Sequence, residues 1–255
     1  MIFDVATIPC LSDNYAFLLH SNETGETALI DAPESGPILR ALDQRGWQLS
    51  EIWLTHHHSD HIDATAEIGA ATGAKIVGAQ ADAHRLPPLN KALSDNDTYQ
   101  FAGHDVRILD VSGHTIGHIA FHVPQADAVF TADSLMALGC GRLFEGSAEQ
   151  MWASLSKLAA LPPGTIVYSG HEYTATNGRF AMTIEPNNER LVQRVAQIKK
   201  ARALGQPTVP STLEEELATN PFLRASNPTV KAALNMSSVT DSEVFREIRR
   251  RKDAF

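Results

Sequence analysis

Short apolar runs separated by polar, glycine-containing turns dominate the first 171 residues of the chain. Such runs are typical of strands, whereas longer stretches with apolar residues every three or four positions are typical of helices. The pattern predicts strands at Tyr15–Leu19, Thr27–Asp31, Glu51–Thr55, Lys75–Ala79, Val106–Val111, Ile119–Val123, Ala128–Thr131 and Thr165–Ser169.

Helices are predicted between these strands from their boundary residues. Proline lies near the start of Pro37–Arg45, and glycine follows both this segment and Asp63–Thr72. Ser147 and Gln150 form a capping-box pattern that opens a third helix, which ends before Leu161. Strands that alternate with helices indicate a layered α/β domain.

After Glu172 the strand signals stop and helical patterns follow. Four helices are predicted, the last with Thr240 and Glu243 as a capping pair: Asn188–Leu204, Thr212–Ala218, Pro228–Leu234 and Asp241–Lys252. We therefore expect two domains, residues 1–171 and residues 172–255, the second smaller and all helical.

Four metal-capable side chains cluster directly after the apolar run Ile52–Leu54. They are His56, His58, Asp60 and His61. On an extended segment His56 and His58 point to the same side, and residues at a following helix start can reach a second position nearby. The segment therefore indicates two neighbouring metal positions, the alternative being a solvated, histidine-rich surface turn.

Three further candidates follow strand-like runs, each beside glycine or another small residue. They are His114, Asp133 and His171. Imidazoles suit zinc, iron and similar divalent ions, and carboxylates can bridge two of them. The chain has no G-x-S-x-G motif, and neither cysteine lies in a nucleophile motif, so hydrolysis without a side-chain nucleophile is favoured.

The set H-x-H-x-D-H, then His, Asp and His, resembles the metallo-β-lactamase superfamily over the first two-thirds of the chain. The resemblance implies a four-layer αβ/βα sandwich with two metal ions at one edge. It assigns His56, His58 and His114 to one ion. It assigns Asp60, His61 and His171 to the other, with Asp133 as the bridge. Zinc is favoured, and iron or manganese would also suit these ligands.

Other segments resemble the glyoxalase II family, the hydroxyacylglutathione hydrolases. They are Gly139–Gly146, Gly170–Thr174, Pro207–Leu213, Asn220–Arg224 and Arg249–Asp253. The resemblance implies hydrolysis of S-D-lactoylglutathione to D-lactate and glutathione, as part of methylglyoxal detoxification. A hydroxide bridging the two metals would attack the thioester, with Asp60 and Asp133 acting through it.

The same resemblance assigns substrate binding to five residues: Arg142, Phe144, Tyr173, Arg249 and Lys252. Arg249 and Lys252 are three apart on a helix and share one face, which suits a glutathione carboxylate. Phe144 stands where some members have a tyrosine, so only ring packing is expected there. Asp133, where β-lactamases have a cysteine, argues against β-lactamase activity.

Two other functions remain open. A glutathione persulfide dioxygenase of the same superfamily would hold one iron ion with two histidines and a carboxylate. An inactive metal-binding or structural protein would be expected to have a broken ligand set, whereas all seven positions are intact here.

The charge distribution argues against a general nucleic-acid binder, which would be expected to be basic. The 255 residues carry a net charge of −9; residues 1–171 have 20 acidic and 8 basic side chains, and residues 172–255 have 10 acidic and 13 basic. No apolar run approaches the ~20 residues of a membrane span. The N-terminus lacks a signal pattern, and only Cys10 and Cys140 are present. We expect a cytoplasmic monomer whose partner is a small glutathione thioester.

Several remaining polar residues have structural or supporting interpretations. Asp31, at a strand end, is a candidate for bracing the site, and His118 either orients a ligand or packs normally. His57 is expected to face away from the site. The other histidines are expected to be surface or structural residues: His20, His84, His104 and His122.

Overall fold

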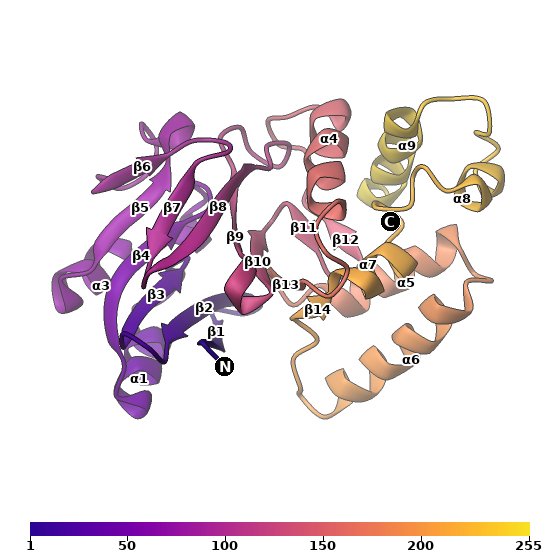
Figure 1. Ribbon diagram of the computed structural model, residues 1–255. Coiled ribbons are helices and arrows are strands. Elements are labelled where there is room, and N and C mark those ends of the chain that lie inside the picture. Colours follow the sequence, from indigo (N-terminus) through magenta and orange to yellow (C-terminus); the bar gives the residue numbers. More distant parts are fainter. The chain divides into compact units, whose positions relative to one another are not determined.

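A computed structural model describes residues 1–255, which form two compact units (Figure 1). The first unit contains Met1–Asp110 and Ile116–Thr131, and the second contains Val111–Thr115 and Ala132–Phe255. None of the helices combines the length and apolar character needed to span a membrane.

A six-stranded mixed sheet of order β1-β2-β3-β4-β5-β6 forms much of the first unit. The first three strands are antiparallel, and β3 to β6 are parallel. The strands are β1 (Phe3–Cys10), β2 (Asn14–Ser21), β3 (Glu26–Ile30), β4 (Gln48–Leu54), β5 (Lys75–Ala79) and β6 (Lys91–Leu93).

Helices connect the parallel strands of this sheet: α1 (Ser35–Arg45), α2 (Ser59–Ile62), α3 (Thr65–Thr72) and the 3-10 turn η1 (Gln80–Asp82). Figure 1 shows α1 and α3 beside the sheet. Ile38 of α1 and Ile68 of α3 belong to the same buried cluster as Leu18, Leu29 and Ile52 of the strands. Burying these aliphatic side chains holds the helices on the sheet.

A second, antiparallel set of strands faces the first sheet within this unit. The order of these strands is β10-β9-β8-β7. They are β7 (Thr98–Phe101), β8 (His104–Asp110), β9 (Ile119–Val123) and β10 (Ala128–Ala132), and the 3-10 turn η2 (Pro124–Ala126) connects β9 to β10. The buried Trp53 of β4 stacks on Phe121 of β9 with ring centroids 5.0 Å apart. Phe17 of β2 lies 5.8 Å from Phe130 of β10. The two sheets are therefore packed face to face through aromatic side chains.

The second unit is mainly helical. Its short strands are β11 (Leu135–Met136), β12 (Gly139–Cys140), β13 (Ile166–Ser169) and β14 (Ser211–Thr212). Its helices are α4 (Ala148–Ala159), α5 (Thr174–Ile184), α6 (Glu189–Ala203), α7 (Leu213–Thr219), α8 (Pro228–Ala233) and α9 (Asp241–Asp253). Trp152 of α4 lies 6.2 Å from Phe245 of α9, and Figure 1 shows these helices side by side. Ala181, Leu191 and Ile198 form an α5–α6 core with Leu138.

All eight predicted strands overlap observed ones, and both capping boxes are confirmed, at Ser147 with Gln150 and at Thr240 with Glu243. The expectation that no strand follows Glu172 was wrong, because β14 pairs with Ile166 and Val167. A two-residue strand has no detectable periodicity. The prediction also missed β1, β6, β7, β11, β12 and α5, and its helix Asp63–Thr72 corresponds to α3 alone, because α2 ends at Ile62.

Candidate metal centre

The H-x-H-x-D-H segment leaves the end of β4 in an extended conformation and enters α2. His56 and His61 are fully buried, and the His56 ring lies 4.8 Å from the His58 ring and 4.3 Å from the His61 ring. The short His56–His58 distance confirms that the two side chains point to the same side. Asn14 Nδ2 donates to the Asp60 carboxylate at 3.0 Å and so restrains its position.

Asp31, at the end of β3, fixes the orientation of His61, as expected for a bracing residue. Its Oδ2 lies 2.8 Å from His61 Nδ1, and its Oδ1 accepts a hydrogen bond from Thr55 N at 2.9 Å. An ionised carboxylate only accepts, so His61 Nδ1 carries the proton and Nε2 is the atom left for a metal. Thr55 Oγ1 also donates to Asp31 and lies 3.0 Å from His56 Nδ1. Sequence reasoning did not identify Thr55.

The downstream candidates His114, Asp133 and His171 lie together and are almost fully buried, at 4%, 6% and 4% exposed. Asp133 Oδ2 is 3.5 Å from His114 Nε2 and 3.3 Å from His171 Nε2. Gly170 N donates to Ala132 O at 3.1 Å, which brings the end of β13 to the end of β10 and His171 to Asp133. One carboxylate therefore faces two imidazoles.

A loop after β12 orients His114. Its Nδ1 lies 2.9 Å from Arg142 O, and because a carbonyl only accepts, Nδ1 is protonated and Nε2 faces Asp133. Gly141 allows this approach. A Cβ at this position would lie 2.1 Å from Asp133 O and 2.7 Å from His114 Nδ1, so any other residue would push the loop away from both candidate ligands.

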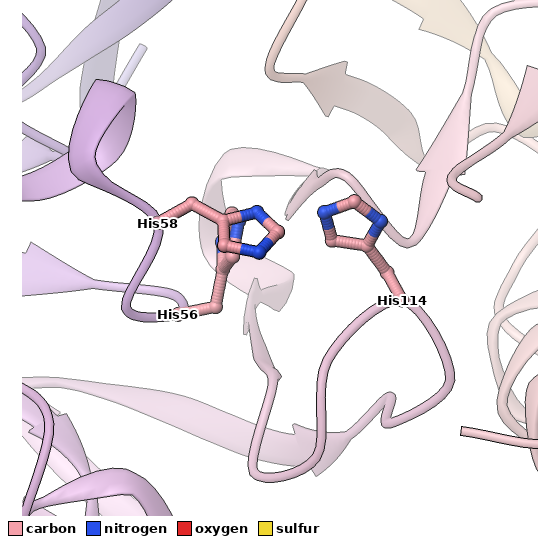
Figure 2. Close-up of side chains that lie close together, drawn as sticks. All are labelled: His56, His58 and His114. Atoms are coloured by element: carbon pink, nitrogen blue, oxygen red, sulfur yellow. The ribbon is translucent and has the colours of Figure 1, made fainter. Parts of the chain in front are cut away.

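Three overlapping groups of these side chains have their ligand atoms within 4.8 Å of one another. They are His56 with His58 and His114; His56 with His61 and Asp133; and Asp60 with His61 and His171. Figure 2 shows the His56, His58 and His114 rings turned toward one another. Each of the seven predicted ligands belongs to at least one group. The donors are all imidazole nitrogens and carboxylate oxygens, a set that fits a divalent transition-metal ion.

The neighbouring histidines have other contacts. His57 Nδ1 lies 3.0 Å from Asp82, a fully buried carboxylate that also accepts from Arg85 Nε at 2.5 Å. His57 is in none of the three groups. His118 is fully buried, with its ring centroid 4.6 Å from that of His56. It therefore packs directly against a candidate ligand.

The candidate substrate residues Phe144 and Tyr173 are aromatic side chains beside ligands. The Phe144 ring, 63% exposed, lies 5.3 Å from the His114 ring. The Tyr173 ring, 40% exposed, stacks on His171 with centroids 4.6 Å apart and planes 5° apart. Both rings therefore offer an accessible packing surface next to the histidines.

Lys252 of α9 has its ammonium 5.3 Å from the Phe180 ring and 5.2 Å from the Phe255 ring. Desolvation by burial, followed by the positive charges of Arg249, Arg179 and Arg142, lowers the pKa of Lys252 to about 8, although Asp253 opposes the shift. The aromatic partners were not predicted from sequence.

Arg249, one turn before Lys252, is only 5% exposed. Its Nη1 donates to Cys140 O at 2.9 Å, its Nη2 lies 2.8 Å from Asp253, and its guanidinium lies over the Phe222 ring at 5.1 Å. Arg249 therefore holds the end of β12 in addition to supplying positive charge. The side chain of Arg142, in contrast, is exposed, with Nε 4.0 Å from Asp253.

Both cysteines are buried free thiols. Burial and the nearby Glu34 raise the pKa of Cys10 to about 12, and burial raises that of Cys140 to about 11. Both therefore stay protonated near neutral pH, which makes them poor nucleophiles and poor metal ligands.

Comparison with known proteins places these features in a family. Residues 12–171 match the model of the metallo-beta-lactamase superfamily, and residues 172–255 match the model described as hydroxyacylglutathione hydrolase C-terminus. The hydroxyacylglutathione hydrolase of Roseobacter denitrificans is 62% identical over 255 residues, all of both chains. That of Methylococcus capsulatus is 52% identical over 254 residues, covering 100% of this chain and 99% of the relative.

Solved structures show the same fold. ETHE1 from Myxococcus xanthus aligns with a TM-score of 0.69 at 24% identity, over 98% of this chain and 90% of that one. TTHA1623, solved in a di-iron-bound form, aligns with a TM-score of 0.62 at 26% identity, over 86% of this chain and all of that one. The predicted metallo-β-lactamase fold with a helical C-terminal segment is confirmed.

Proposed function

The chain belongs to the hydroxyacylglutathione hydrolase family, and we propose that it hydrolyses S-D-lactoylglutathione to D-lactate and glutathione with two divalent metal ions. The family makes it a thioester hydrolase. The observation that carries the two-ion proposal is the overlap of three histidine and carboxylate groups. One ion would leave several of these buried ligands unused.

We assign His56, His58 and His114 to one ion and Asp60, His61 and His171 to the other, with Asp133 between them. The 3.3 and 3.5 Å distances from Asp133 Oδ2 to His171 and His114 support its bridging position. Zinc is our preferred metal. The ligands, all nitrogen or oxygen, also suit iron and manganese, so supply in the cell would influence which ion is bound.

Two bound ions lower the pKa of a coordinated water toward neutrality and polarise the substrate carbonyl. The chain's own side chains prepare the ligands for this role. Asp31 and the Arg142 carbonyl each hold one imidazole with Nδ1 protonated, so that Nε2 is directed to the centre. Asn14 holds the Asp60 carboxylate. The leaving group is a thiol with an ordinary pKa near 8.5, so no dedicated proton donor is required.

The glutathione part of the substrate carries carboxylates, and four basic side chains of the second unit suit them. Lys252 shares its surroundings with Arg142, Arg179 and Arg249, whose charges act on its pKa. We propose that Lys252 and Arg142 contact the substrate, and that Arg249 adds charge while holding Cys140. Tyr173 supplies a hydroxyl and a ring, and Phe144 supplies ring packing alone.

We further propose that residues 1–171 carry the metals and residues 172–255 bind glutathione. A monomer in the reducing cytoplasm, where glutathione is abundant and both cysteines would remain thiols, is our expected working state. The match of the helical segment to a hydroxyacylglutathione hydrolase model supports the division.

A glutathione persulfide dioxygenase with one iron ion is the alternative. The structural similarity to ETHE1, at 24% identity, concerns the fold alone. Full-length relatives at 52–62% identity favour the hydrolase. Measuring metal content together with lactoylglutathione hydrolysis separates the two: we expect two ions per chain and thioester cleavage. One iron per chain with oxygen consumption would contradict the proposal.

A further inference from the structure

A buried carboxylate lies in the helical segment, away from the candidate ligands in sequence. Glu216 of α7 is fully buried, and its Oε1 accepts from Ser211 Oγ at 2.6 Å and from the Arg194 guanidinium. Its Oε2 accepts from Leu138 N at 2.9 Å and from Asn220 Nδ2 at 3.0 Å. Four donors therefore converge on two oxygens. Buried ion pairs seldom add net stability over apolar packing, so such a cluster points to a geometric role.

The cluster holds the tip of the β11–β12 hairpin. Asn220 Nδ2 lies 3.0 Å from both Met136 O and Gly139 O, and Asn177 Nδ2 donates to Ala137 O at 3.1 Å. Leu138 itself has a left-handed φ of 57°, which a non-glycine residue adopts only when its surroundings enforce it. Hydrogen bonds from α5 and α7 thus fix four consecutive hairpin residues.

The hairpin joins two parts of the metal centre. Only Ser134 separates Asp133 from the start of β11, and the Gly141–Arg142 segment follows β12 directly. Gly141 N donates to Ser134 O at 3.2 Å, and Arg142 O accepts from His114 Nδ1 at 2.9 Å. A displaced hairpin tip would therefore change the positions of both the Asp133 carboxylate and the His114 imidazole.

We propose that Glu216, supported by Asn220, is a positioning residue for the metal centre, acting on Asp133 and His114 through the β11–β12 hairpin. This inference rests on the proposed ligand roles of Asp133 and His114. It gives the helical C-terminal segment a second task besides substrate binding, namely the support of a metal-binding geometry whose ligands all precede it in sequence.

The test is Glu216→Gln, which keeps the size of the side chain. The two oxygens of Glu216 accept from four donors, whereas a glutamine side chain has only one accepting oxygen. We expect at least one metal to bind tenfold or more weakly in competition with a chromophoric chelator. We also expect the visible absorption of the cobalt(II)-loaded protein to change. The matched control is Glu214→Gln, on the same helix, whose carboxylate is 64% exposed and 3.4 Å from Arg190. It should match the unmodified protein in both measurements.

Asn220→Ala is the second variant, because it keeps the Glu216–Arg194 pair while removing the donor to Met136 and Gly139. Its metal binding should weaken in the same direction, with circular dichroism showing a folded chain. Unchanged affinity and spectrum in both variants would overturn the proposal. So would failure of both to fold beside a folded Glu214→Gln control, because the cluster would then serve folding alone. If the unmodified protein binds no metal pair, the proposed function fails instead.

Discussion

The Asp31 carboxylate lies 2.8 Å from Nδ1 of His61, and both side chains are almost fully buried. The pair is 30 residues apart in sequence and joins the ends of β3 and α2. Because this carboxylate fixes which imidazole nitrogen is protonated, it determines that Nε2 is the His61 atom left to bind a metal.

Asp31→Asn is expected to weaken metal binding. An amide has one accepting oxygen for three donors, Thr55 N, Thr55 Oγ1 and His61 Nδ1. Losses of about 10–100-fold in metal affinity or activity are typical of such partners. Chelator competition measures the effect, and Asp63→Asn, at an exposed position nearby, is the control. Equal affinity in the two variants would remove Asp31 from the supporting role.

Asp133→Ala should remove the carboxylate that faces both His114 and His171. We expect the loss of at least one metal ion and of most turnover. Elemental analysis after gel filtration gives the stoichiometry. A variant that keeps two tightly bound ions and normal turnover would refute the bridging assignment.

Gly141→Ala should disrupt the centre by steric overlap, since its Cβ would lie 2.1 Å from Asp133 O. Overpacking of this kind costs about 1–3 kcal/mol of stability. We expect weaker metal binding and a lower melting temperature. Gly164→Ala is the matched control, because nothing lies within 4 Å of its added Cβ. Equal metal affinity and melting temperature in the two variants would show that the Gly141 loop can move without disturbing the candidate metal centre.

The KM of the unmodified protein should rise with pH above about 8. The pKa of Lys252 is lowered to about 8, so its ammonium is charged below that pH and lost above it. If Lys252 contacts an anionic substrate, as proposed, only its charged form would hold that substrate. In Lys252→Arg the KM should no longer rise with pH in this range, because a guanidinium stays protonated. If the KM of Lys252→Arg still rises with pH in the same way, another titrating group must cause the rise.

Phe255→Ala provides a separate check on Lys252. Removing a ring that lies 5.2 Å from the ammonium increases the hydration of the ammonium, so the pKa of Lys252 should rise. The increase in KM should then begin at a higher pH. Arg249, Arg179, Arg142 and Asp253 remain in place and set the rest of the shift. If KM rises at the same pH in Phe255→Ala as in the unmodified protein, the ring does not shield the ammonium from water.

Lys252→Ala and Arg249→Ala should differ in kind. Loss of a charge-assisted substrate contact costs ~1.5–3 kcal/mol, so Lys252→Ala should raise KM at least tenfold with little change in kcat. Arg249→Ala should also lower kcat, because Cys140 O loses its buried donor.

Rising salt should weaken substrate binding to the unmodified protein more than to the variants. A small neutral thioester should be cleaved poorly and equally by the unmodified protein and Lys252→Ala.

Local sequence patterns were sufficient to predict most of the elements and the candidate ligands. Most candidate ligands are detectable because they follow an apolar run near a strand end, as His56 comes after the strand that ends at Leu54 and His171 after the strand that ends at Ser169. Ser147 and Thr240 mark helix starts because a capping box depends on residues three apart. These signals involve near neighbours, so a single sequence contains them completely.

Only the tertiary structure decided how distant residues support the site. Cys140 and Arg249 are 109 residues apart, and Leu138 and Glu216 are 78 apart. Neither pair leaves a periodic pattern in the sequence. The sequence placed Arg249 on one helix face with Lys252 as a candidate carboxylate partner, but it did not reveal that Arg249 is buried against Phe222 and Cys140. Burial and hydrogen-bond geometry arise from packing of the whole chain, and so they cannot be read from neighbouring residues.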